Sequence, residues 1–533
     1  MTKYIFITGG VVSSLGKGIV AASLGRLLRA RGFSVANQKL DPYLNVDPGT
    51  MSPFQHGEVF VTDDGGEADL DLGHYERFTG TSLSKINSLP AGSIYSSVIN
   101  KERRGEFHGG TVQVVPHITN EIKAGIQRAA KQFNPDFLIT EIGGTVGDIE
   151  SLPHIEAIRQ FRAEEGYDKT LSIHVTLLPY LQTSGELKTK PSQHSVNTLR
   201  GFGIQPEILV CRTQKAIPKE EKDKLALFCS VPKECVVECI DMATIYEVPL
   251  ALEEQGLAEV ILKKLNMPNK KPNLDTWKKI VESAKNPTHK VKVGIIGECD
   301  EVNDAYLSVV ESLKHAGFEQ DTKIEIKWIM SEVCTTEEKT KEKVGDLDAI
   351  VVPGVDGAKG IEGKLNIIKY ARENNIPFLG ISLGFQCAAL EFARNVAGLV
   401  DANSSEFAAQ TPHPVISLME SIKPSGTMRL GSSETILKTN TKIKLAYGEK
   451  TIQERHRHRY ELNTEYQKIL EDNGLVISGT SSDGALADCL ELPNLDFFVA
   501  CQYHPEFKSR PETPHPLFKG LLKATLKQVK NRK

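Results

Sequence analysis

The sequence lacks the features that would indicate a zinc framework, a disulfide scaffold or a membrane protein. Its nine cysteines are spread over 533 residues and form no CxxC pair, so neither zinc nor disulfides are expected to hold the fold. No apolar run approaches the ~18 residues that a membrane helix needs, and the apolar stretch within residues 1–10 is too short for a secretory signal. We therefore expect a cytoplasmic protein that does not contact a membrane.

An excess of charge of one sign is also missing. The 64 basic and 68 acidic side chains leave a formal net charge of −4, which provides no overall attraction to nucleic acid. The charged fraction of 25% and the aromatic fraction of 7% are typical of globular proteins and exclude disordered and fibrous classes. At ~150 residues per domain, the length predicts about three or four domain-sized units.

Short apolar segments alternate with helical patterns along the chain, which favours a parallel α/β sheet with its sites at the carboxyl ends of the strands. A helix is expected at about residues 19–31, with Leu24, Leu27 and Leu28 on one face. The segments with a strand pattern are residues 4–8, 137–142, 171–178, 291–296, 349–352 and 378–381.

Two lysine-rich segments differ in composition from the rest of the chain. Residues 266–292 contain three prolines, seven lysines and few apolar residues, a composition typical of a linker between domains. Residues 519–533 are also rich in lysine, with apolar residues at roughly helical spacing. They are expected to form a surface helix and a frayed tail.

A glycine-rich turn follows the first expected strand. Residues 9–18 read GGVVSSLGKG, a pattern in which backbone N–H groups surround phosphates while Lys17 supplies a cation. A standard Walker A loop has Ser or Thr after this lysine to hold Mg²⁺, but here the position is Gly18. Asp71 and Glu141 are oxygen donors of the right hardness to hold the metal instead. We interpret the turn as a nucleotide phosphate site rather than as a plain turn.

Two further stretches are unusually polar for their surroundings. Residues 39–43 read KLDPY, and residues 188–193 read KTKPSQ. Either could be an exposed loop, but their cations would also suit a second polyphosphate. Two bound nucleotides would indicate phosphoryl transfer onto one of them.

Five longer motifs stand out in the first half of the chain: SSLGKG at 13–18, the long segment 38–65, DLDLGHYERF at 69–78, GGTVGDIES at 143–151 and KTKPSQHS at 188–195. Together they resemble the amidoligase domain of CTP synthases, and the resemblance covers essentially the whole chain. It implies an N-terminal P-loop-type parallel-sheet α/β domain. In that family ATP phosphorylates O4 of the UTP uracil, and ammonia displaces the phosphate to give CTP, so an ATP-dependent C–N ligase of pyrimidine biosynthesis is expected.

The resemblance also implies roles for individual residues. Lys17 and Lys39 would lie on the ATP phosphates, where cations stabilise the charge of the transferred phosphoryl group, and Asp71 and Glu141 would hold Mg²⁺. The other implied ATP contacts are Ser14, Leu15, Gly16, Gly18 and Ile19. The implied contacts of UTP, or of CTP as feedback inhibitor, are Ser13, Asp148, Ile149, Glu150, Lys188, Thr189, Lys190, Pro191, Ser192, Gln193 and Lys224.

The second half resembles a class I glutamine amidotransferase α/β domain. Such a domain needs a thiolate nucleophile on a strand-to-helix turn, a His–Glu pair to activate it and an oxyanion hole. His504 and Glu506 provide the pair, and Arg459 stands at the glutamine-binding position in ERHRHRY. Alone, that basic run could be a nucleic-acid patch, which its isolation disfavours. The other implied glutamine contacts are Val355, Leu383, Gly384, Phe385, Gln386 and Glu406.

Three residues depart from the amidotransferase pattern. Ser382 stands where the family has its nucleophilic cysteine, and a serine hydroxyl is far less acidic than a thiol. Val355 replaces a glycine in the oxyanion loop, and Asp356 would place negative charge near a developing oxyanion. The hypothesis is a synthase that uses free ammonia while glutamine hydrolysis is absent or weak. The alternative is a glutamine-dependent enzyme in which Ser382 is an engineered change.

The expected organisation is an amidoligase domain at residues 1–266, a linker at 267–290 and an amidotransferase-like domain at 291–533. The resemblance further implies a homotetramer, and GTP as an effector. Two rival interpretations are a nucleotide-binding filament or regulatory protein, and a P-loop ATPase. The complete set of Lys17, Asp71 and Glu141 disfavours the first, and the loop at 188–193 disfavours the second.

Overall fold

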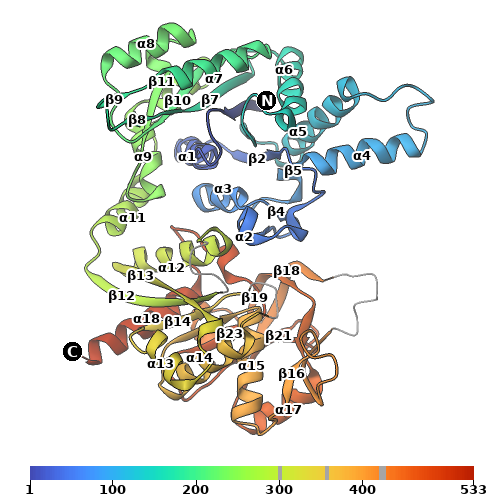
Figure 1. Ribbon diagram of the computed structural model, residues 1–533, viewed down its shortest axis with the longest axis vertical. Helices are drawn as coiled ribbons and strands as arrows, with labels where there is room; N and C mark the ends of the chain where they lie inside the picture. The colour runs from blue at the N-terminus through green and yellow to red at the C-terminus, as the bar shows by residue number, and fades with distance from the viewer. Residues whose placement is uncertain (298–302, 355–358, 419–427, 533) are drawn as a thin grey trace. The chain divides into compact units, whose positions relative to one another are not determined.

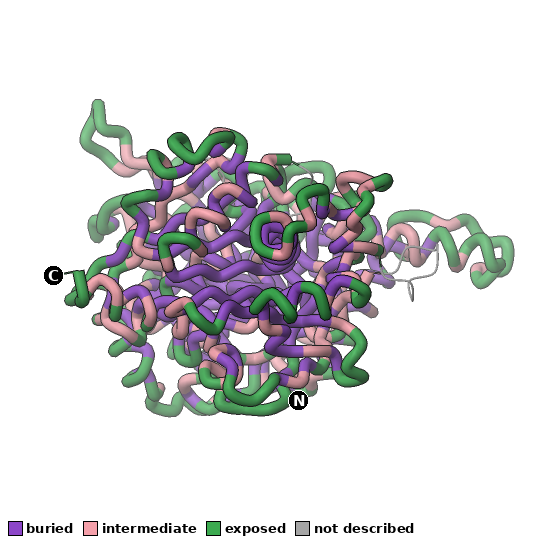
Figure 2. The backbone as a smooth tube through the Cα atoms, turned by 90° about the horizontal axis from the view of Figure 1, so that it is seen from below, coloured by how far each residue is buried: buried purple, intermediate pink, exposed green. Residues whose placement is uncertain are grey.

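The computed structural model describes residues 1–532 apart from 298–302, 355–358 and 419–427 (Figure 1). The chain forms two compact units, one of residues 1–51 and 67–281 and the other of residues 52–66 and 282–533. Within the described residues, no helix combines the length and apolar character needed to cross a membrane. Each unit is built on its own central sheet, whose strands are mostly buried (Figure 2).

The first unit contains a seven-stranded sheet in which every strand pair is parallel. The strand order is β11-β10-β7-β1-β6-β2-β5. Strand β2 is buried at every position and β1 at all but its first, as expected for parallel strands covered on both faces. The strands are β1 Lys3–Gly9, β2 Val35–Asp41, β5 Ser88–Pro90, β6 Phe137–Ile142, β7 Thr170–Leu178, β10 Ile208–Thr213 and β11 Val236–Ile240.

Helices cover the first sheet. Phe6 and Leu138 share one core with Ile122 and Phe161 of two helices. Because side chains alternate along a strand, Ile5 points to the other face, where α1 packs. The helices are α1 Lys17–Ala30, α3 Asp71–Thr79, α4 Ala91–Arg103, α5 Thr119–Phe133, α6 Leu152–Glu165, α7 Lys190–Gly201, α8 Lys219–Cys229, α9 Val248–Glu254, α10 Leu257–Lys264 and α11 Asp275–Lys285, and a small hairpin joins β8 Tyr180–Leu181 to β9 Glu186–Leu187.

The second unit contains a nine-stranded mixed sheet of order β13-β12-β14-β15-β23-β22-β21-β18-β19. The pairs from β13 to β23 are parallel and those from β23 to β19 are antiparallel. The strands are β12 His289–Gly297, β13 Thr322–Met330, β14 Ala349–Val352, β15 Phe378–Ile381, β18 Arg429–Leu437, β19 Thr451–His458, β21 Val476–Ser481, β22 Ala487–Glu491 and β23 Phe498–Cys501. A smaller sheet holds β16 Ala402–Ser404, β17 His413–Leu418 and β20 Tyr460–Leu462.

Both faces of the parallel part of this sheet carry helices. Phe378 faces a core with residues of α14 and α15, whereas Leu379 faces a core with residues of α12 and α18. This alternation along one strand is that of a doubly wound α/β fold. The helices are α2 Pro53–His56, α12 Leu307–Glu319, α13 Glu337–Val344, α14 Ile361–Glu373, α15 Leu383–Asn395, α16 Lys442–Tyr447, α17 Thr464–Asp472 and α18 Pro516–Arg532.

Most expected elements are present, but two lysine-rich segments are more ordered than their composition indicates. Helix α11 lies inside the expected linker, and its Trp277 is completely buried. The division between the two units falls within α11, after Val281. The expected frayed tail is instead the last part of α18, where Leu521 and Leu522 are buried. The expected helix is therefore present and packs Leu521 and Leu522 into the core, whereas the frayed tail was wrong, because the helix runs on to Arg532.

Residues 52–66 pack with the second unit, although in sequence they lie between the two segments of the first unit. The Glu58 carboxylate accepts hydrogen bonds from the N–H and hydroxyl groups of Ser308, the first at 2.7 Å. Asp63 pairs with the buried Arg455 at 2.6 Å. Such contacts between residues far apart in sequence leave no signal in a local pattern.

Candidate functional site

The glycine-rich turn of the first unit lies between β1 and α1, as the sequence predicts. The backbone has positive φ at Val11, Ser14 and Gly16, which turns the chain sharply before α1. Lys17 is buried, and its ammonium group donates to the carbonyl oxygen of Gly144 at 2.9 Å. Burial lowers the pKa of Lys17. The turn therefore places a desolvated cation at a helix N-terminus, which is the arrangement that binds phosphate.

Lys39 joins the two expected metal ligands. Its ammonium group pairs with Asp71 and lies 2.9 Å from a carboxylate oxygen of Glu141. The Tyr75 hydroxyl donates to the other oxygen of Glu141. Lys39 and Glu141 occupy neighbouring parallel strands in register, whereas Asp71 and Tyr75 lie on α3. Three expected site residues thus form one buried cluster.

The charges of this cluster do not balance. Four carboxylates act electrostatically on Lys17 or Lys39. They belong to Asp41, Asp69, Asp71 and Glu141. Burial raises the pKa of Asp41 to about 6, and it also raises the pKa of Asp69 and Glu141. Burial acts the same way on Asp71, but Lys39, His74 and Lys17 together outweigh it and lower the pKa of Asp71. The cluster therefore carries more carboxylate than its own cations neutralise.

This excess of carboxylate fits a hard divalent cation. Within the described residues, no three or more His, Cys, Asp or Glu side chains are grouped as a metal site. Mg²⁺ commonly binds through one or two carboxylates, with phosphate oxygens and water completing its shell. A side chain at residue 18 would clash with the Asp71 carboxylate. The absence of a Walker hydroxyl thus leaves room for Asp71 beside the phosphate-binding turn.

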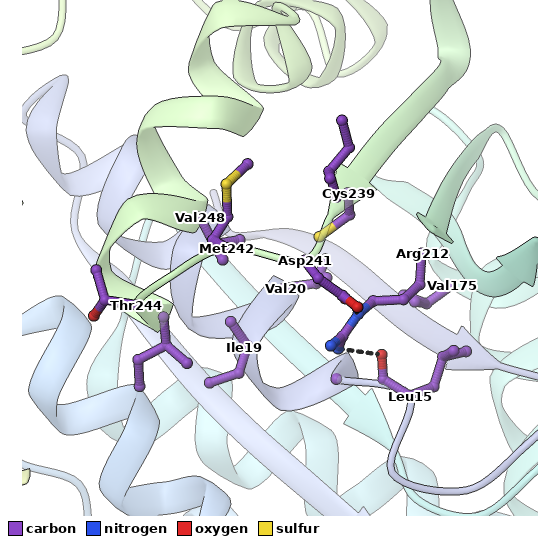
Figure 3. Close-up of a pocket in the computed structure, with 13 residues that line it drawn as sticks. Leu15, Ile19, Val20, Val175, Arg212, Cys239, Asp241, Met242, Thr244 and Val248 are labelled. Carbon is purple, nitrogen blue, oxygen red and sulfur yellow. Dashed lines mark hydrogen bonds and ion pairs between the residues drawn. The ribbon is translucent and has the colours of Figure 1, made fainter. Parts of the chain in front are cut away.

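A pocket lies beside the same turn, between α1 and the carboxyl ends of β10 and β11 (Figure 3). Arg212 crosses its edge and donates to the carbonyl oxygen of Leu15 at 3.2 Å, while Asp241 holds the same guanidinium at 2.8 Å. Ile19 and Val248 contribute apolar walls. The cavity has a volume of about 80 Å³ and opens to solvent at its mouth.

The expected UTP residues occupy α7, the hairpin before it and α8. Ser192 and Gln193 are buried at the start of α7, where the Ser192 hydroxyl donates to the carbonyl oxygen of Leu177 at 2.9 Å. Glu186 of the hairpin has a lowered pKa because of its hydrogen bond to Lys188 and the charge of Lys224. The structure therefore brings these two lysines near one carboxylate.

The remaining expected nucleotide contacts lie on exposed turns. Ser13 and Ser14 belong to the phosphate-binding turn and are exposed. Asp148, Ile149 and Glu150 are also exposed at the start of a turn before α6, and 81% of the Ile149 side chain is accessible.

In the second unit, Ser382 occupies the sharp turn between β15 and α15. Its backbone has φ +50° and ψ −103°, a strained conformation typical of a nucleophile at a strand-to-helix elbow. Its N–H donates to the carbonyl oxygen of Cys501 at 2.8 Å, at the end of the neighbouring strand β23. The neighbouring thiol of Cys387 is buried, and burial raises its pKa to about 11. Cys387 therefore cannot take the place of the missing thiolate.

His504 follows β23 and faces Ser382. A methyl group placed on Gly354 would lie 2.5 Å from Ser382 Cβ and 3.0 Å from His504 Cε1, so both side chains border the same point. His504 Nδ1 lies 2.7 Å from a carboxylate oxygen of Glu506, and all three side chains are buried. Val355 and Asp356, the two departures in the expected oxyanion loop, lie outside the described residues.

The expected glutamine contacts lie around this turn and on the small sheet. Leu383, Gly384, Phe385 and Gln386 form the buried first turn of α15, and the Gln386 amide donates to the carbonyl oxygen of Tyr460 at 3.2 Å. Arg459 precedes β20 and Glu406 follows β16 of the same three-stranded sheet, and both residues are exposed.

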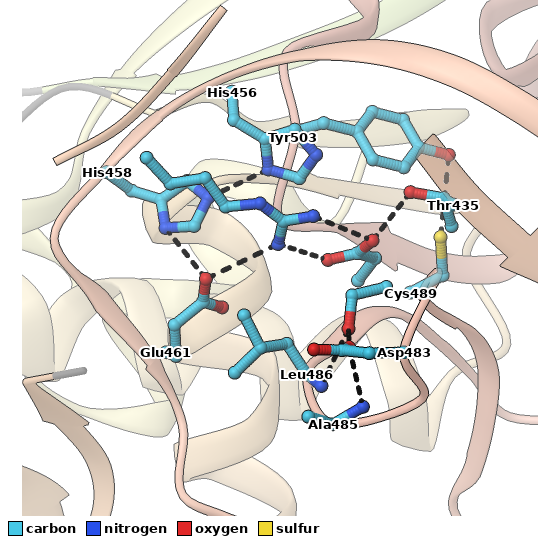
Figure 4. A network of polar contacts seen from close by, with 12 residues as sticks. Thr435, His456, His458, Glu461, Asp483, Ala485, Leu486, Cys489 and Tyr503 are labelled. Carbon is cyan, nitrogen blue, oxygen red and sulfur yellow. Dashed lines mark hydrogen bonds and ion pairs between the residues drawn. The ribbon is translucent and has the colours of Figure 1, made fainter. Parts of the chain in front are cut away.

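A buried polar network joins residues of β18, β19, β20 and β22 (Figure 4). Arg429 pairs with Asp488 at 2.6 Å and with Glu461 at 3.5 Å. His456 and His458 are hydrogen-bonded through their rings at 2.9 Å. Burial raises the pKa of Glu461 to about 8 and lowers that of both histidines, each of which also feels the charge of His504. The basic segment at residues 454–460 is therefore mostly buried.

Sequence reasoning missed some residues of the first site. Tyr75 is a motif residue without an assigned role, and its contact with Glu141 depends on tertiary structure. Arg212 and Asp241 stand at or just beyond the carboxyl ends of β10 and β11. A polar residue at the carboxyl end of an apolar strand could have identified Arg212 and Asp241 as site candidates from the sequence.

Comparisons with known proteins agree with this picture. Residues 3–267 match the family described as CTP synthase N-terminus, and residues 301–524 match the family described as Glutamine amidotransferase class-I. A CTP synthase of Carboxydothermus hydrogenoformans is 57% identical over 534 residues, covering 99% of this chain and 100% of the relative. A CTP synthase of Methanocaldococcus jannaschii is 57% identical over 533 residues, covering 98% of each chain.

Among solved structures, the chain is similar to the glutaminase domain of a Trypanosoma brucei CTPS with bound acivicin. That domain is 34% identical, covers 44% of this chain and 94% of that chain, and has a TM-score of 0.43. The identity to full-length relatives extends over both sites described above. The chain belongs to the CTP synthase family, with an N-terminal synthase part and a C-terminal glutamine amidotransferase part.

Proposed function

We propose that this chain converts UTP to CTP with ATP and free ammonia, and that its second unit hydrolyses glutamine weakly or not at all. Membership of the CTP synthase family supports the first part, because its members are ATP-dependent ligases that make CTP from UTP. The single observation that carries the second part is Ser382, which occupies the nucleophile position beside the His504–Glu506 pair.

In the first unit, Lys17 is suited to bind the outer phosphates of ATP. Its buried ammonium group lies at the N-terminus of α1, so cation and helix act on the same anion. The pocket lined by Ile19, Arg212 and Val248 is suited to the adenine base, because it is largely apolar and lies beside the turn. Ser14, Leu15, Gly16 and Gly18 would surround the nucleotide between these two parts.

Asp71 and Glu141 would hold Mg²⁺, which would neutralise phosphate charge during transfer to the uracil oxygen. Lys39 holds these two carboxylates in place and brings a second cation to the cluster. Its role is to keep the carboxylates ionised and oriented while phosphoryl transfer develops charge. The exposed residues Ser13 and Asp148–Glu150, the partly buried segment Lys188–Gln193 and Lys224 are proposed to bind UTP or product CTP.

In the second unit, loss of the thiolate is the reason for weak glutamine hydrolysis. A thiol beside a histidine can ionise before attack, whereas a serine hydroxyl must lose its proton as the new bond forms. The sequence places Val355 and Asp356 in the oxyanion loop, where a β-branched side chain and a negative charge oppose an oxyanion. Three departures indicate an inherited loss rather than one engineered change.

Several further properties follow from the family resemblance. We propose a homotetramer, feedback inhibition by CTP and an amidoligase domain at 1–266, with a linker at 267–290 and an amidotransferase-like domain at 291–533. GTP is proposed as an effector of the second unit. Sedimentation and CTP titration of the ammonia-dependent reaction test the first two.

The decisive experiment for the synthase is an assay with ammonium chloride, ATP, Mg²⁺ and UTP. ATP hydrolysis should require UTP, and each phosphate released should accompany one CTP. ATP hydrolysis without UTP would favour a P-loop ATPase, and nucleotide binding without turnover would favour a regulatory protein.

A further inference from the structure

We propose that Ser382, His504 and Glu506 form a serine-type acyl-transfer site that accepts small, activated carboxylic esters. This activity goes beyond CTP formation and does not depend on it. The three residues have the types and connections of a nucleophile, a base and an orienting acid. Their chemistry differs from that of a cysteine site in the attacking atom, an oxygen instead of a sulfur, and in the reagents that label it.

The position of Ser382 is the first argument. It follows the parallel strand β15 and begins α15, with a positive φ that presents its side chain at the strand end. A non-glycine residue holds this conformation only when the surrounding structure fixes it. The hydrogen bond from the Ser382 N–H to Cys501 and that from Gln386 to the Ser382 carbonyl, at 2.8 and 3.1 Å, provide that constraint.

The state of His504 is the second argument. Its Nδ1 shares a hydrogen bond of 2.7 Å with Glu506, which favours the tautomer with the proton on Nδ1. Nε2 is then the basic nitrogen, and it is buried without a hydrogen-bond partner in the described structure. A buried imidazole nitrogen next to a serine is available to take the hydroxyl proton.

The surroundings of Gly354 are the third argument. A Cβ at this glycine would approach both Ser382 Cβ and His504 Cε1, so the glycine leaves open the point that both side chains border. Helix α15 begins at Leu383, the residue directly after the nucleophile. The Leu383 N–H can therefore donate to an oxyanion. An acyl group at this point would meet nucleophile, base and a helix N-terminus together.

The reaction balances with water as the second reactant. Ser382 Oγ forms a bond to the acyl carbon while His504 Nε2 takes its proton. The ester C–O bond then breaks, and His504 returns that proton to the leaving alcohol. Water attacks the acyl-serine through the same base, the acyl–Oγ bond breaks, and Ser382 regains its proton as the carboxylic acid leaves.

Esters suit this site better than glutamine. An alcohol with a low pKa leaves without prior protonation, whereas an amide nitrogen must be protonated to leave. The residues Ser382 and His504 are only 6% and 5% exposed, so the site favours small acyl groups. The proposal therefore commits to short-chain activated esters, with p-nitrophenyl acetate as the probe.

The test is covalent labelling of the full-length protein with diisopropyl fluorophosphate, followed by intact mass and peptide mapping. We expect one adduct, on Ser382. Release of p-nitrophenol from p-nitrophenyl acetate should show a burst of about one equivalent. His504→Ala should slow both reactions by at least ~10²-fold, and Glu506→Gln by a smaller factor.

Cys387→Ser is the matched control, because it removes the nearest buried thiol on α15 and should leave labelling unchanged. Ser382→Ala should remove the adduct, and thermal melting of each variant reports folding. Absence of an adduct on Ser382 in the unmodified sequence, or labelling that does not depend on His504, would overturn the proposal. The readout uses no nucleotide, so it cannot be confused with failure to form CTP.

Discussion

The ammonium nitrogen of Lys39 lies 2.9 Å from a carboxylate oxygen of Glu141. Lys39 is on β2 and Glu141 on the neighbouring parallel strand β6, and both side chains are buried. The same nitrogen pairs with Asp71 of α3. One lysine thus connects the sheet to the helix that carries the second candidate metal ligand. The arrangement makes Lys39 part of the structure of the site as well as of its charge.

Replacing Lys39 with methionine should lower ammonia-dependent CTP formation by at least ~10²-fold, because the carboxylates lose their cation. It should also destabilise the first unit by about 3–5 kcal/mol, the cost of leaving buried charges unpaired. Rate assays and denaturant unfolding measure the two effects. Lys101→Met, which breaks the partly exposed pair with Glu121, is the control. Equal effects of both variants would contradict the assigned role.

Restoring the missing Walker hydroxyl by Gly18→Ser should decrease activity rather than improve it. A Cβ at this position would clash with the Asp71 carboxylate, which must then move away from the metal site. We expect a strong loss of UTP-dependent ATP hydrolysis. Gly201→Ala is the control, because a Cβ there meets no atom within 4 Å. A Gly18→Ser protein with unchanged or higher turnover would show that Asp71 is not held where we place it.

Glu461 should make the second unit less stable at alkaline pH. Burial raises its pKa from 4.5 in the unfolded chain to about 8 in the folded state. Stability from the protonated carboxyl is therefore complete below pH 4.5 and is lost as the pH rises through about 8, because the unfolded state then binds fewer protons. Glu461→Gln should reduce this loss.

Denaturant unfolding at pH 5 and pH 8.5 measures the effect of Glu461. The control is Glu434→Gln, which changes an exposed carboxylate of β18 in the same unit. The original sequence and the control should lose stability over this pH range, and Glu461→Gln should lose less. Identical pH dependence in all three proteins would contradict a protonated Glu461.

Ser382→Cys alone should not restore full glutamine use. The new thiol would sit beside His504 and should react with iodoacetamide faster than the buried Cys387. Glutamine-dependent CTP formation should nevertheless stay well below the ammonia-dependent rate, because the substitutions at 355 and 356 remain. Rates comparable to those with ammonia would place the whole defect at residue 382.

The sequence predicts six strands of the two main sheets and the phosphate-binding turn, because these depend on local patterns such as the buried apolar run of β1 before the glycines. It does not predict the antiparallel strands of the second sheet. It does not predict the Lys39–Glu141 pair, which joins residues 102 positions apart. The same holds for Arg455, whose partner Asp63 lies 392 positions away. Trp277 shows a further limit, since its burial against Tyr246, to whose carbonyl it donates at 2.7 Å, overrides a composition typical of a linker.

The central claim is that the first site works while the second no longer supplies nitrogen from glutamine. The most direct measurement is the rate of CTP formation at saturating ATP and UTP, first with ammonium chloride and then with glutamine, with and without GTP. We predict robust synthesis with ammonium and little or none with glutamine. Glutamine-dependent synthesis at a rate close to the ammonium rate would contradict the account.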